Sequence, residues 1–164
     1  MLCLNCFMRY IILIWFFAFL SCKEAKNHEL ATTITGKVIK VKDGDTIDIL
    51  FENKPLTIRF ADIDCPEKSQ PFGKAARQFV SAKCFGQVVT IKHLNKYDRW
   101  HRLVGTVLAT SGENINISLL QAGLAWHYKK YSNNPGYSVL EQEAKQRQLG
   151  VWSEVNAVAP WDWR

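Results

Sequence analysis

The sequence lacks an apolar run of about 20 residues, the length that a membrane-spanning helix requires. It also lacks internal repeats and low-complexity segments. Its 12% of aromatic residues and 22% of charged residues exclude a largely disordered or collagen-like chain. At 164 residues, one globular domain is the natural interpretation.

Cysteine and histidine are also scarce. Beyond Cys22 only Cys65 and Cys84 remain, and two cysteines permit a disulfide without requiring one. A bridge and two semi-buried thiols therefore stay open as alternatives. The four histidines show no metal-ligand spacing with one another or with these two cysteines, which excludes a zinc site.

Positive charge exceeds negative charge, with a net charge of +6. Arg9 is the only charged residue before Cys22, so the excess belongs to the rest of the chain. Such an excess favours anionic partners, either nucleic acid or an acidic lipid surface, but many basic proteins bind neither. The net charge alone does not distinguish these possibilities, so the choice depends on the sequence motifs.

Residues 1–21 have the pattern of a secretory signal peptide, because Arg9 precedes the apolar stretch from Tyr10 to Leu20. Leu20-Ser21-Cys22 is similar to a bacterial lipobox, in which the cysteine is lipidated, although Phe19 departs from the usual aliphatic residue. Ordinary secretion and an uncleaved signal anchor are the alternatives. All three export the domain, as a bacterial cell-envelope lipoprotein or a secreted protein. Residues 22–31 are polar and predict a flexible tether, which leaves 32–164 as the domain.

β-branched and alternating patterns predict five short strands over residues 33–41, 45–49, 56–61, 88–94 and 103–108. The connection between the second and third strands is a hairpin at 52–55. In the third strand Leu56, Ile58 and Phe60 share one face, which leaves Arg59 on the other.

Helical spacing predicts three helices over residues 72–83, 116–122 and 137–149. Asn116 is the expected N-cap of the second helix, Gly123 ends it, and Gly150 ends the third. We expect the Trp-rich segment after Val151 to pack on the body. The fold class is thus α+β, a small five-stranded barrel of the oligonucleotide-binding (OB) type with three α-helices.

Three segments concentrate charge: 43–46, 59–67 and 98–102. Each has an ordinary structural explanation, since Asp-Gly-Asp is a common turn, Arg59 can point at water, and Asp98-Arg99 can form a surface ion pair. Taken together, the three segments also permit a functional site. If Asp45, Asp64 and Glu67 meet at one end of the barrel, they form an all-oxygen site that suits Ca²⁺.

Two arginines beside such a site, Arg59 and Arg102, would provide planar forks for phosphate oxygens. A cation, two guanidinium groups and a spare carboxylate are the groups needed to cleave a phosphodiester. The cation and arginines stabilise charge on the phosphorus oxygens, while the carboxylate orients or deprotonates an attacking water.

The order and spacing of these segments resemble the staphylococcal-nuclease-like (thermonuclease) family. The resemblance runs from about Thr33 to Ser153, and it also includes Gly73-Lys74, Gly123-Leu124-Ala125 and Gly150-Val151-Trp152-Ser153. The tail from Pro160 to Arg164 is similar to the endings of bacterial members. The resemblance implies an OB-fold barrel and Ca²⁺-dependent hydrolysis of DNA and RNA that leaves 3′-phosphate products.

The resemblance also implies roles for individual residues. Asp45 and Asp64 match the carboxylate ligands of one Ca²⁺ ion, and position 65 supplies a backbone carbonyl, so Cys65 in place of the familiar Thr need not harm it. Glu67 matches the residue that positions or deprotonates water, and Arg59 and Arg102 match the phosphate-binding arginines.

Three departures from the family concern the substrate surface. Trp100 and His101 replace a Tyr-Gly pair; Trp100 can still stack on a base, while His101 is strained if its φ is positive. Tyr131 matches a nucleotide-contacting tyrosine, and Lys129 stands where the other tyrosine is expected. We therefore expect Trp100, Tyr131 and Lys129 to contact nucleic acid with altered base or end preference.

Two functions of different classes follow. The first is an exported Ca²⁺-dependent nuclease of low sequence specificity. The alternative is a non-catalytic OB-fold lipoprotein that binds nucleic acid. Since all five charged positions are present, the sequence favours the enzyme. We expect a monomer that meets the membrane only through an N-terminal lipid anchor.

Overall fold

The computed structural model describes residues 32–164. The predicted leader with Cys22 and the predicted tether over 22–31 lie outside the described residues. The elements follow the order β1 (Thr32–Val41), β2 (Thr46–Phe51), β3 (Lys54–Phe60), β4 (Ile63–Asp64), α2 (Gly73–Cys84), β5 (Val88–Tyr97), β6 (Leu103–Leu108), α3 (Ile115–Gln121), β7 (Trp126–His127), α4 (Pro135–Gln146), the 3₁₀ helix η1 (Gly150–Ser153) and α5 (Pro160–Trp163).

Five strands form a closed barrel in the order β1-β2-β3-β6-β5, which confirms the predicted OB-type barrel. The ten-residue β1 pairs with β5 through its first half and with β2 through its second half. A register shift between Val38 and Lys40 bends the strand between its two partners. The parallel pairing of β3 with β6 closes the barrel.

The inward residues are the apolar positions of the alternating pattern, including Ile47, Ile49, Ile58, Phe60 and Ile91, each at most 1% exposed. Gly105 in β6 faces β5, where a Cβ would lie 2.7 Å from the Ile91 side chain. The glycine lets the two strands approach closely over this tightly packed interior.

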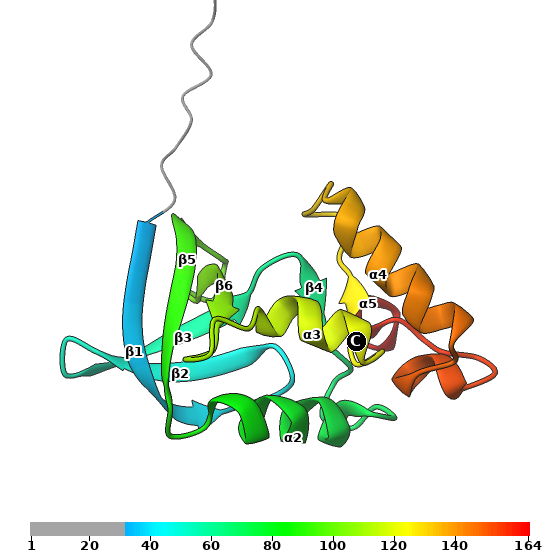
Figure 1. Ribbon diagram of the computed structural model, residues 1–164, viewed down its shortest axis with the longest axis horizontal. Helices are drawn as coiled ribbons and strands as arrows, with labels where there is room; N and C mark the ends of the chain where they lie inside the picture. Colours follow the sequence, from blue (N-terminus) through cyan, green and yellow to red (C-terminus); the bar gives the residue numbers. More distant parts are fainter. Residues whose placement is uncertain (1–31) are drawn as a thin grey trace, which may run out of the picture.

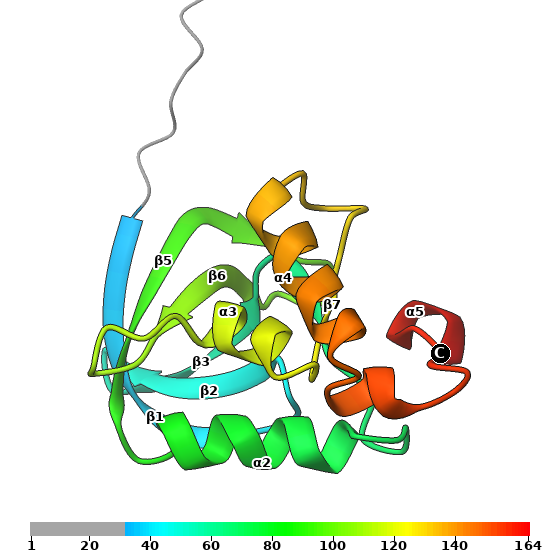
Figure 2. The ribbon, with the colours of Figure 1, turned by 45° about the vertical axis from the view of Figure 1, so that its right-hand side comes forward.

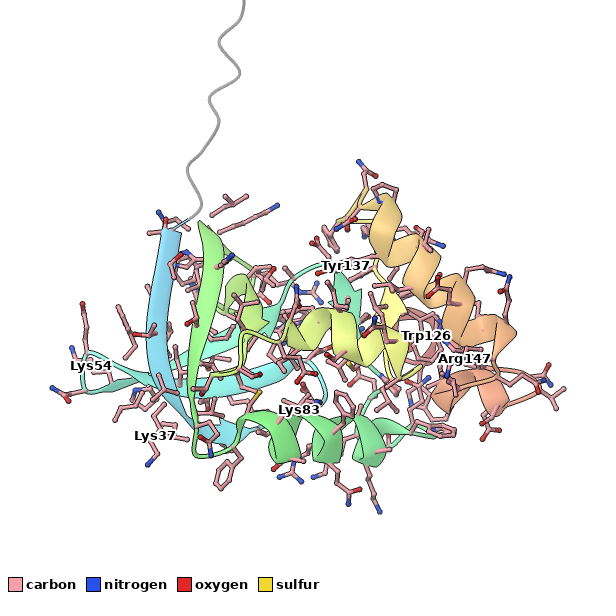
Figure 3. The ribbon with its side chains drawn as sticks, viewed as in Figure 1. Lys37, Lys54, Lys83, Trp126, Tyr137 and Arg147 are labelled. Carbon is pink, nitrogen blue, oxygen red and sulfur yellow. The ribbon has the colours of Figure 1, made fainter. Side chains whose placement is uncertain are left out.

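The helices cover the barrel on different sides. In Figure 1, α2 runs beneath the barrel, α3 crosses its front, and α4 and α5 lie together at one end. The turned view in Figure 2 shows the same grouping of α4, η1 and α5 at this end, beside β7. Side chains of Lys37 and Lys54 mark the opposite end, away from Trp126 and Arg147 (Figure 3). Elements distant in sequence therefore meet at one end of the barrel.

The structure corrects several predicted boundaries. The expected helix over 116–122 begins instead at Ile115, and its N-cap is Asn114, whose side chain accepts from the Ile117 N–H. Asn116 is fully buried: its side chain accepts from the Val107 N–H at 3.1 Å and donates to the Ala61 carbonyl at 2.9 Å. The predicted cap is thus a core polar residue that joins α3 to the barrel.

The third predicted helix is also displaced. It spans Pro135–Gln146, because Asn134 caps it and Pro135 occupies its first turn, and Gln148 at φ 51° already lies outside it. Gly150 opens η1 instead of ending this helix. Residues 32–164 hold four α-helices in place of the predicted three, the fourth being α5, and the two-stranded sheet of β4 and β7 was not predicted.

Both cysteines of the described region are free and buried. Of the two alternatives, the pair of thiols is therefore correct. Within residues 32–164, none of the helices has the length and apolar character that crossing a bilayer requires.

Replacing the buried amide Asn116→Ala should lower the free energy of unfolding by about 2–4 kcal/mol, because the Val107 N–H and the Ala61 carbonyl would both lose their partner. Urea denaturation measures the loss. The control is Asn133→Ala, which changes an exposed asparagine and should stay within about 0.5 kcal/mol of the parent. Equal stabilities would contradict a structural role for Asn116.

Candidate functional site

The Asp43-Gly44-Asp45 turn joins β1 to β2 and packs closely against Ala76 and Cys65. A Cβ on Gly44 would lie 2.7 Å from Ala76 and 2.8 Å from the Cβ of Cys65. Asp45 is 5% exposed, and its Oδ2 accepts from the backbone N–H of Cys65 at 2.7 Å. The turn is thus fixed to the segment that leaves β4.

Arg59 bridges two carboxylates from separate elements. Its Nη1 lies 3.0 Å from Asp45 Oδ2, and its Nη2 donates to Asp64 Oδ1 at 2.7 Å. Arg59 is only 9% exposed, so it does not point at water as its strand face would allow. The reason is that the β1–β2 turn and the β4–β7 sheet cover this end of β3.

The site holds more carboxylate charge than Arg59 neutralises. Burial, together with repulsion from Asp45, raises the pKa of Asp64 to about 6, although Arg59 and Arg164 oppose the shift. Burial and the same neighbour raise the pKa of Asp43 to about 7. For Arg59, burial acts to lower the pKa, but Asp45 and Asp64 outweigh it and the pKa is raised. An added positive charge beside Asp64 is therefore favourable.

Cys65 contributes backbone chemistry to this site. Its side chain is buried, and burial raises the pKa of the thiol well above its ordinary value. The sulfur therefore stays protonated and is neither a metal ligand nor a nucleophile in this state.

Arg102 joins the same network from the loop between β5 and β6. Asp98 holds it, with Oδ2 2.6 Å from both Nε and Nη2, so the partner of Asp98 is Arg102 and not the adjacent Arg99. Arg102 Nη1 lies 3.2 Å from Thr46 Oγ1, and that hydroxyl donates to Asp45 Oδ1 at 3.1 Å. One hydroxyl thus links the second arginine to the acidic cluster.

Glu67 joins the set through Arg164, a residue outside the predicted charged set. Arg164 Nε lies 2.9 Å from Glu67 Oε1, and Arg164 Nη2 also pairs with Asp64 Oδ2. The structure therefore brings Asp45, Arg59, Asp64, Glu67 and Arg102 into one chain of contacts, while their individual roles stay predictions. Thr46 lies within the segment 43–46 that the sequence singles out, but the sequence predicts no role for it. Arg164 carries no spacing signal in the sequence, and only the tail's similarity to family endings includes it.

A divalent metal would have to bind among paired groups. Within the part of the chain that the structure describes, no three His, Cys, Asp or Glu side chains are arranged as a metal cage. Two adjacent carboxylates, Asp45 and Asp64, nevertheless offer the oxygen donors that Ca²⁺ prefers. Besides burial, repulsion from Asp45 raises the pKa of Asp64, and a cation beside the two carboxylates would oppose that repulsion, so the donor chemistry fits this ion.

The predicted substrate residues lie on the surface around this network. Trp100 is 55% exposed, and the guanidinium groups of Arg99 and Arg102 lie over its ring, 4.0 and 4.8 Å from the ring centroid. His101 has a φ of 58°, so the strain expected at this position is present. Tyr131 is 64% exposed, and Lys129 is exposed with its ammonium 3.2 Å from Glu141.

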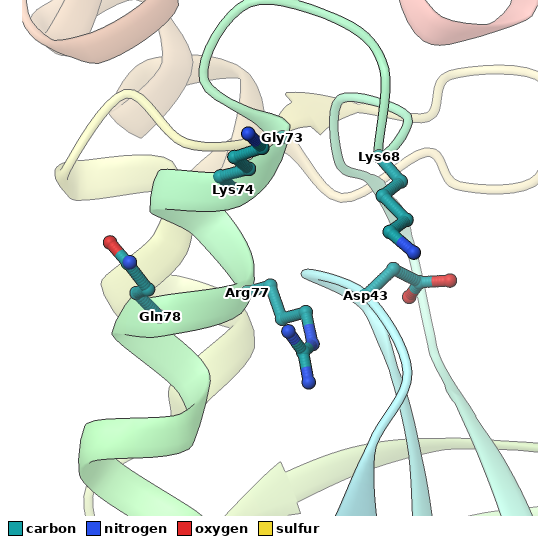
Figure 4. Close-up of a pocket in the computed structure, with 6 residues that line it drawn as sticks. All are labelled: Asp43, Lys68, Gly73, Lys74, Arg77 and Gln78. Carbon is teal, nitrogen blue, oxygen red and sulfur yellow. The ribbon is translucent and has the colours of Figure 1, made fainter.

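Two hollows flank the network. One of about 450 Å³ lies between β7, α4 and α5, and its walls include Tyr128, Lys129 and Trp161. A smaller one of about 160 Å³ is lined by Asp43, Lys68, Gly73, Lys74, Arg77 and Gln78. Figure 4 shows Lys68 and Arg77 directed toward the loop that carries Asp43. The surface beside the carboxylates is thus largely basic.

The chain is also similar in sequence to known proteins. A family model described as staphylococcal nuclease homologue matches residues 57–154. This range includes the second half of β3, all of β4 and the loop that carries Arg102.

Relatives match over most of the chain. An uncharacterized endonuclease of Escherichia coli O157:H7 is 38% identical over 135 residues, which cover 82% of this chain and 88% of that protein. A micrococcal nuclease of Shigella flexneri is 39% identical over 139 residues, or 79% of each chain. An uncharacterized endonuclease of Haemophilus influenzae is 34% identical over 154 residues, 93% of this chain and 82% of that one.

Replacing Arg59→Gln should lower the free energy of unfolding by about 3 kcal/mol or more at neutral pH, because Asp45 and Asp64 would be left buried without their shared guanidinium. Urea denaturation gives the value. Arg77→Gln is the matched control: it removes an exposed arginine whose Nε donates to the Val41 carbonyl, and should cost about 1 kcal/mol. Similar losses in the two variants would show that the bridge is not a structural constraint.

Proposed function

Because the chain belongs to the staphylococcal nuclease family, we propose that it is an exported Ca²⁺-dependent nuclease that hydrolyses phosphodiester bonds of DNA, RNA or both with low sequence specificity. The observation that carries the proposal is the chain of contacts that joins Asp45, Arg59 and Asp64 to Arg102 and Glu67 at one end of the barrel. Relatives that are named endonuclease and micrococcal nuclease support the same reaction.

The carboxylates and the backbone at the end of β4 are the groups suited to the ion. Asp45, Asp64 and the carbonyl of Cys65 would hold Ca²⁺, which when bound supplies positive charge beside the phosphate oxygens. Asp45 and Asp64 are kept adjacent by Arg59, so this chain positions both donors before any ion arrives.

The remaining residues act on the phosphodiester. Glu67, 37% exposed at its side chain, accepts a proton from water as the water oxygen bonds to phosphorus. The bond from phosphorus to the 5′ oxygen breaks, that oxygen takes up a proton, and a 3′-phosphate and a 5′-hydroxyl result. Arg59 and Arg102 stabilise the charge that builds on the other phosphorus oxygens. Asp98 orients Arg102 for this role, because its carboxylate pairs with both Nε and Nη2 of the guanidinium.

Export and lipidation rest on the sequence of residues 1–22. The apolar stretch behind Arg9 and the lipobox-like Leu20-Ser21-Cys22 support a domain delivered to the cell envelope or beyond. There the substrate would be extracellular nucleic acid, and the protein would act as a monomer.

The purified protein should degrade single-stranded DNA with Ca²⁺ and stop when a chelator is added. Glu67→Gln and Arg102→Ala should each lower kcat about 100-fold or more. The first variant removes the proton acceptor, and the second removes a positive charge that stabilises the transition state. Glu143→Gln and Arg147→Ala, exposed residues of the α4 region, serve as controls and should retain the rate. Binding of DNA without Ca²⁺-dependent cleavage would instead support the non-catalytic alternative, and 5′-phosphate products would contradict the proposed bond cleavage.

Tyr131→Ala should raise KM roughly tenfold with a smaller effect on kcat, because an exposed ring that stacks on a base contributes about 1–3 kcal/mol to binding. Steady-state kinetics on a short oligonucleotide separates the two constants. Phe85→Ala, which removes an exposed aromatic residue at the end of α2, is the control. An unchanged KM for Tyr131→Ala would place the substrate elsewhere on the surface.

A further inference from the structure

Arg164 contacts the two carboxylates that the proposed reaction needs most. Its Nη2 pairs with Asp64 Oδ2, and its Nε lies 2.9 Å from Glu67 Oε1. Asp64 Oδ1 already accepts a hydrogen bond from Arg59, so Arg164 pairs with the other carboxylate oxygen, Oδ2. The Arg164 guanidinium thus pairs at once with Asp64, the proposed metal ligand, and with Glu67, the proposed proton acceptor.

Contacts along the preceding residues hold this arginine in place. The Trp161 ring stacks on Tyr128 with centroids 5.2 Å apart and planes 6° apart. Gln70 Nε2 donates to the Val158 carbonyl at 2.5 Å, and Pro160 is buried. We call residues 158–164 the strap, because it is attached to the loop after β4 at one end and to Tyr128 near the other.

The strap is tied directly to the site as well as to the body. Gln70 Oε1 accepts from the Glu67 N–H at 3.0 Å, so the side chain that binds the strap also fixes the backbone of Glu67. Gln70 itself is 6% exposed. The position of Arg164 is therefore coupled to the carboxylate that it covers.

A divalent cation held by Asp64 would compete with Arg164 for this carboxylate, whose other oxygen is already occupied by Arg59, and the like charges of the cation and the guanidinium would repel at such short range. The Arg164 side chain is 41% exposed and Trp161 is 39% exposed. Pro160 is buried, but within the described residues the hydrophobic core cluster contains none of residues 158–164, so the strap can leave without opening that core. A protein whose binding-competent form is only partly populated binds its ligand more weakly by that fraction.

We propose that Arg164 is a built-in competitor of the metal ion, held by the strap against Asp64 and Glu67 and released when the cation binds. The inference rests on the proposed function, because it takes Asp64 as a ligand of Ca²⁺. The strap sets the cation concentration at which the site becomes active, and Glu67 is freed to accept a proton in the same step.

Isothermal titration of the purified protein with Ca²⁺ tests the proposal without an activity readout. Arg164→Gln should bind Ca²⁺ roughly tenfold more tightly than the parent, as expected if the competitor occupies the site about nine-tenths of the time. Trp161→Ala, which loosens the strap but keeps the arginine, should give a smaller gain. Lys37→Gln removes one positive charge at the opposite end of the barrel and should leave the affinity unchanged (Figure 3).

The outcomes separate this inference from the proposed function. Equal or weaker Ca²⁺ binding by Arg164→Gln overturns the competition while Ca²⁺-dependent cleavage by the parent still stands. A lower maximal rate with unchanged Ca²⁺ affinity also overturns it, since Arg164 would then act on the substrate. If neither the parent nor the variants bind Ca²⁺ while their thermal unfolding shows folded protein, the metal dependence of the proposed function fails and the competition fails with it.

Discussion

The guanidinium of Arg59 between Asp45 and Asp64 is the constraint on which the site depends. Two buried carboxylates repel each other. The planar guanidinium directs one terminal nitrogen to each of them, so it offsets part of their charge and fixes how they face one another. Because the cost of burying these charges is offset only in this geometry, the turn before β2 and the end of β4 are held in register with β3. The rest of the site is arranged around that bridge.

The barrel gives this bridge a rigid base. β3 pairs with β2 on one side and with β6 on the other, so the backbone of Arg59 is held from both edges. The loops that carry Asp45 and Arg102 leave the neighbouring strands at the same end, and the β4–β7 sheet adds Asp64 there. Sites of this kind combine a rigid scaffold with loop-borne chemistry, which lets each loop contribute one group at a defined position.

Charge balance links the proposed reaction to the strap. Burial, with added repulsion from Asp45, raises the pKa of Asp43 and of Asp64. Asp43, Asp45, Asp64 and Glu67 also outnumber the arginines that remain when Arg164 is discounted, which leaves an excess of negative charge. A guanidinium and a divalent ion are two ways of relieving it. A site that attracts a catalytic cation also attracts a cation of its own chain, provided that a segment is anchored nearby to deliver it.

The sequence by itself determined the barrel, since β-branched alternation placed all five strands, and it identified the charged set through spacing and family resemblance. It could not place Asn116 in the core, because an asparagine before an apolar pair fits a helix cap equally well. It left Arg59 free to face water, because strand alternation distinguishes two faces but not what covers them. Only the tertiary structure decided these points, and only it joined Arg164 to Asp64 across 100 residues of sequence. Long-range ion pairs depend on where packed elements end in space, and no local pattern encodes that.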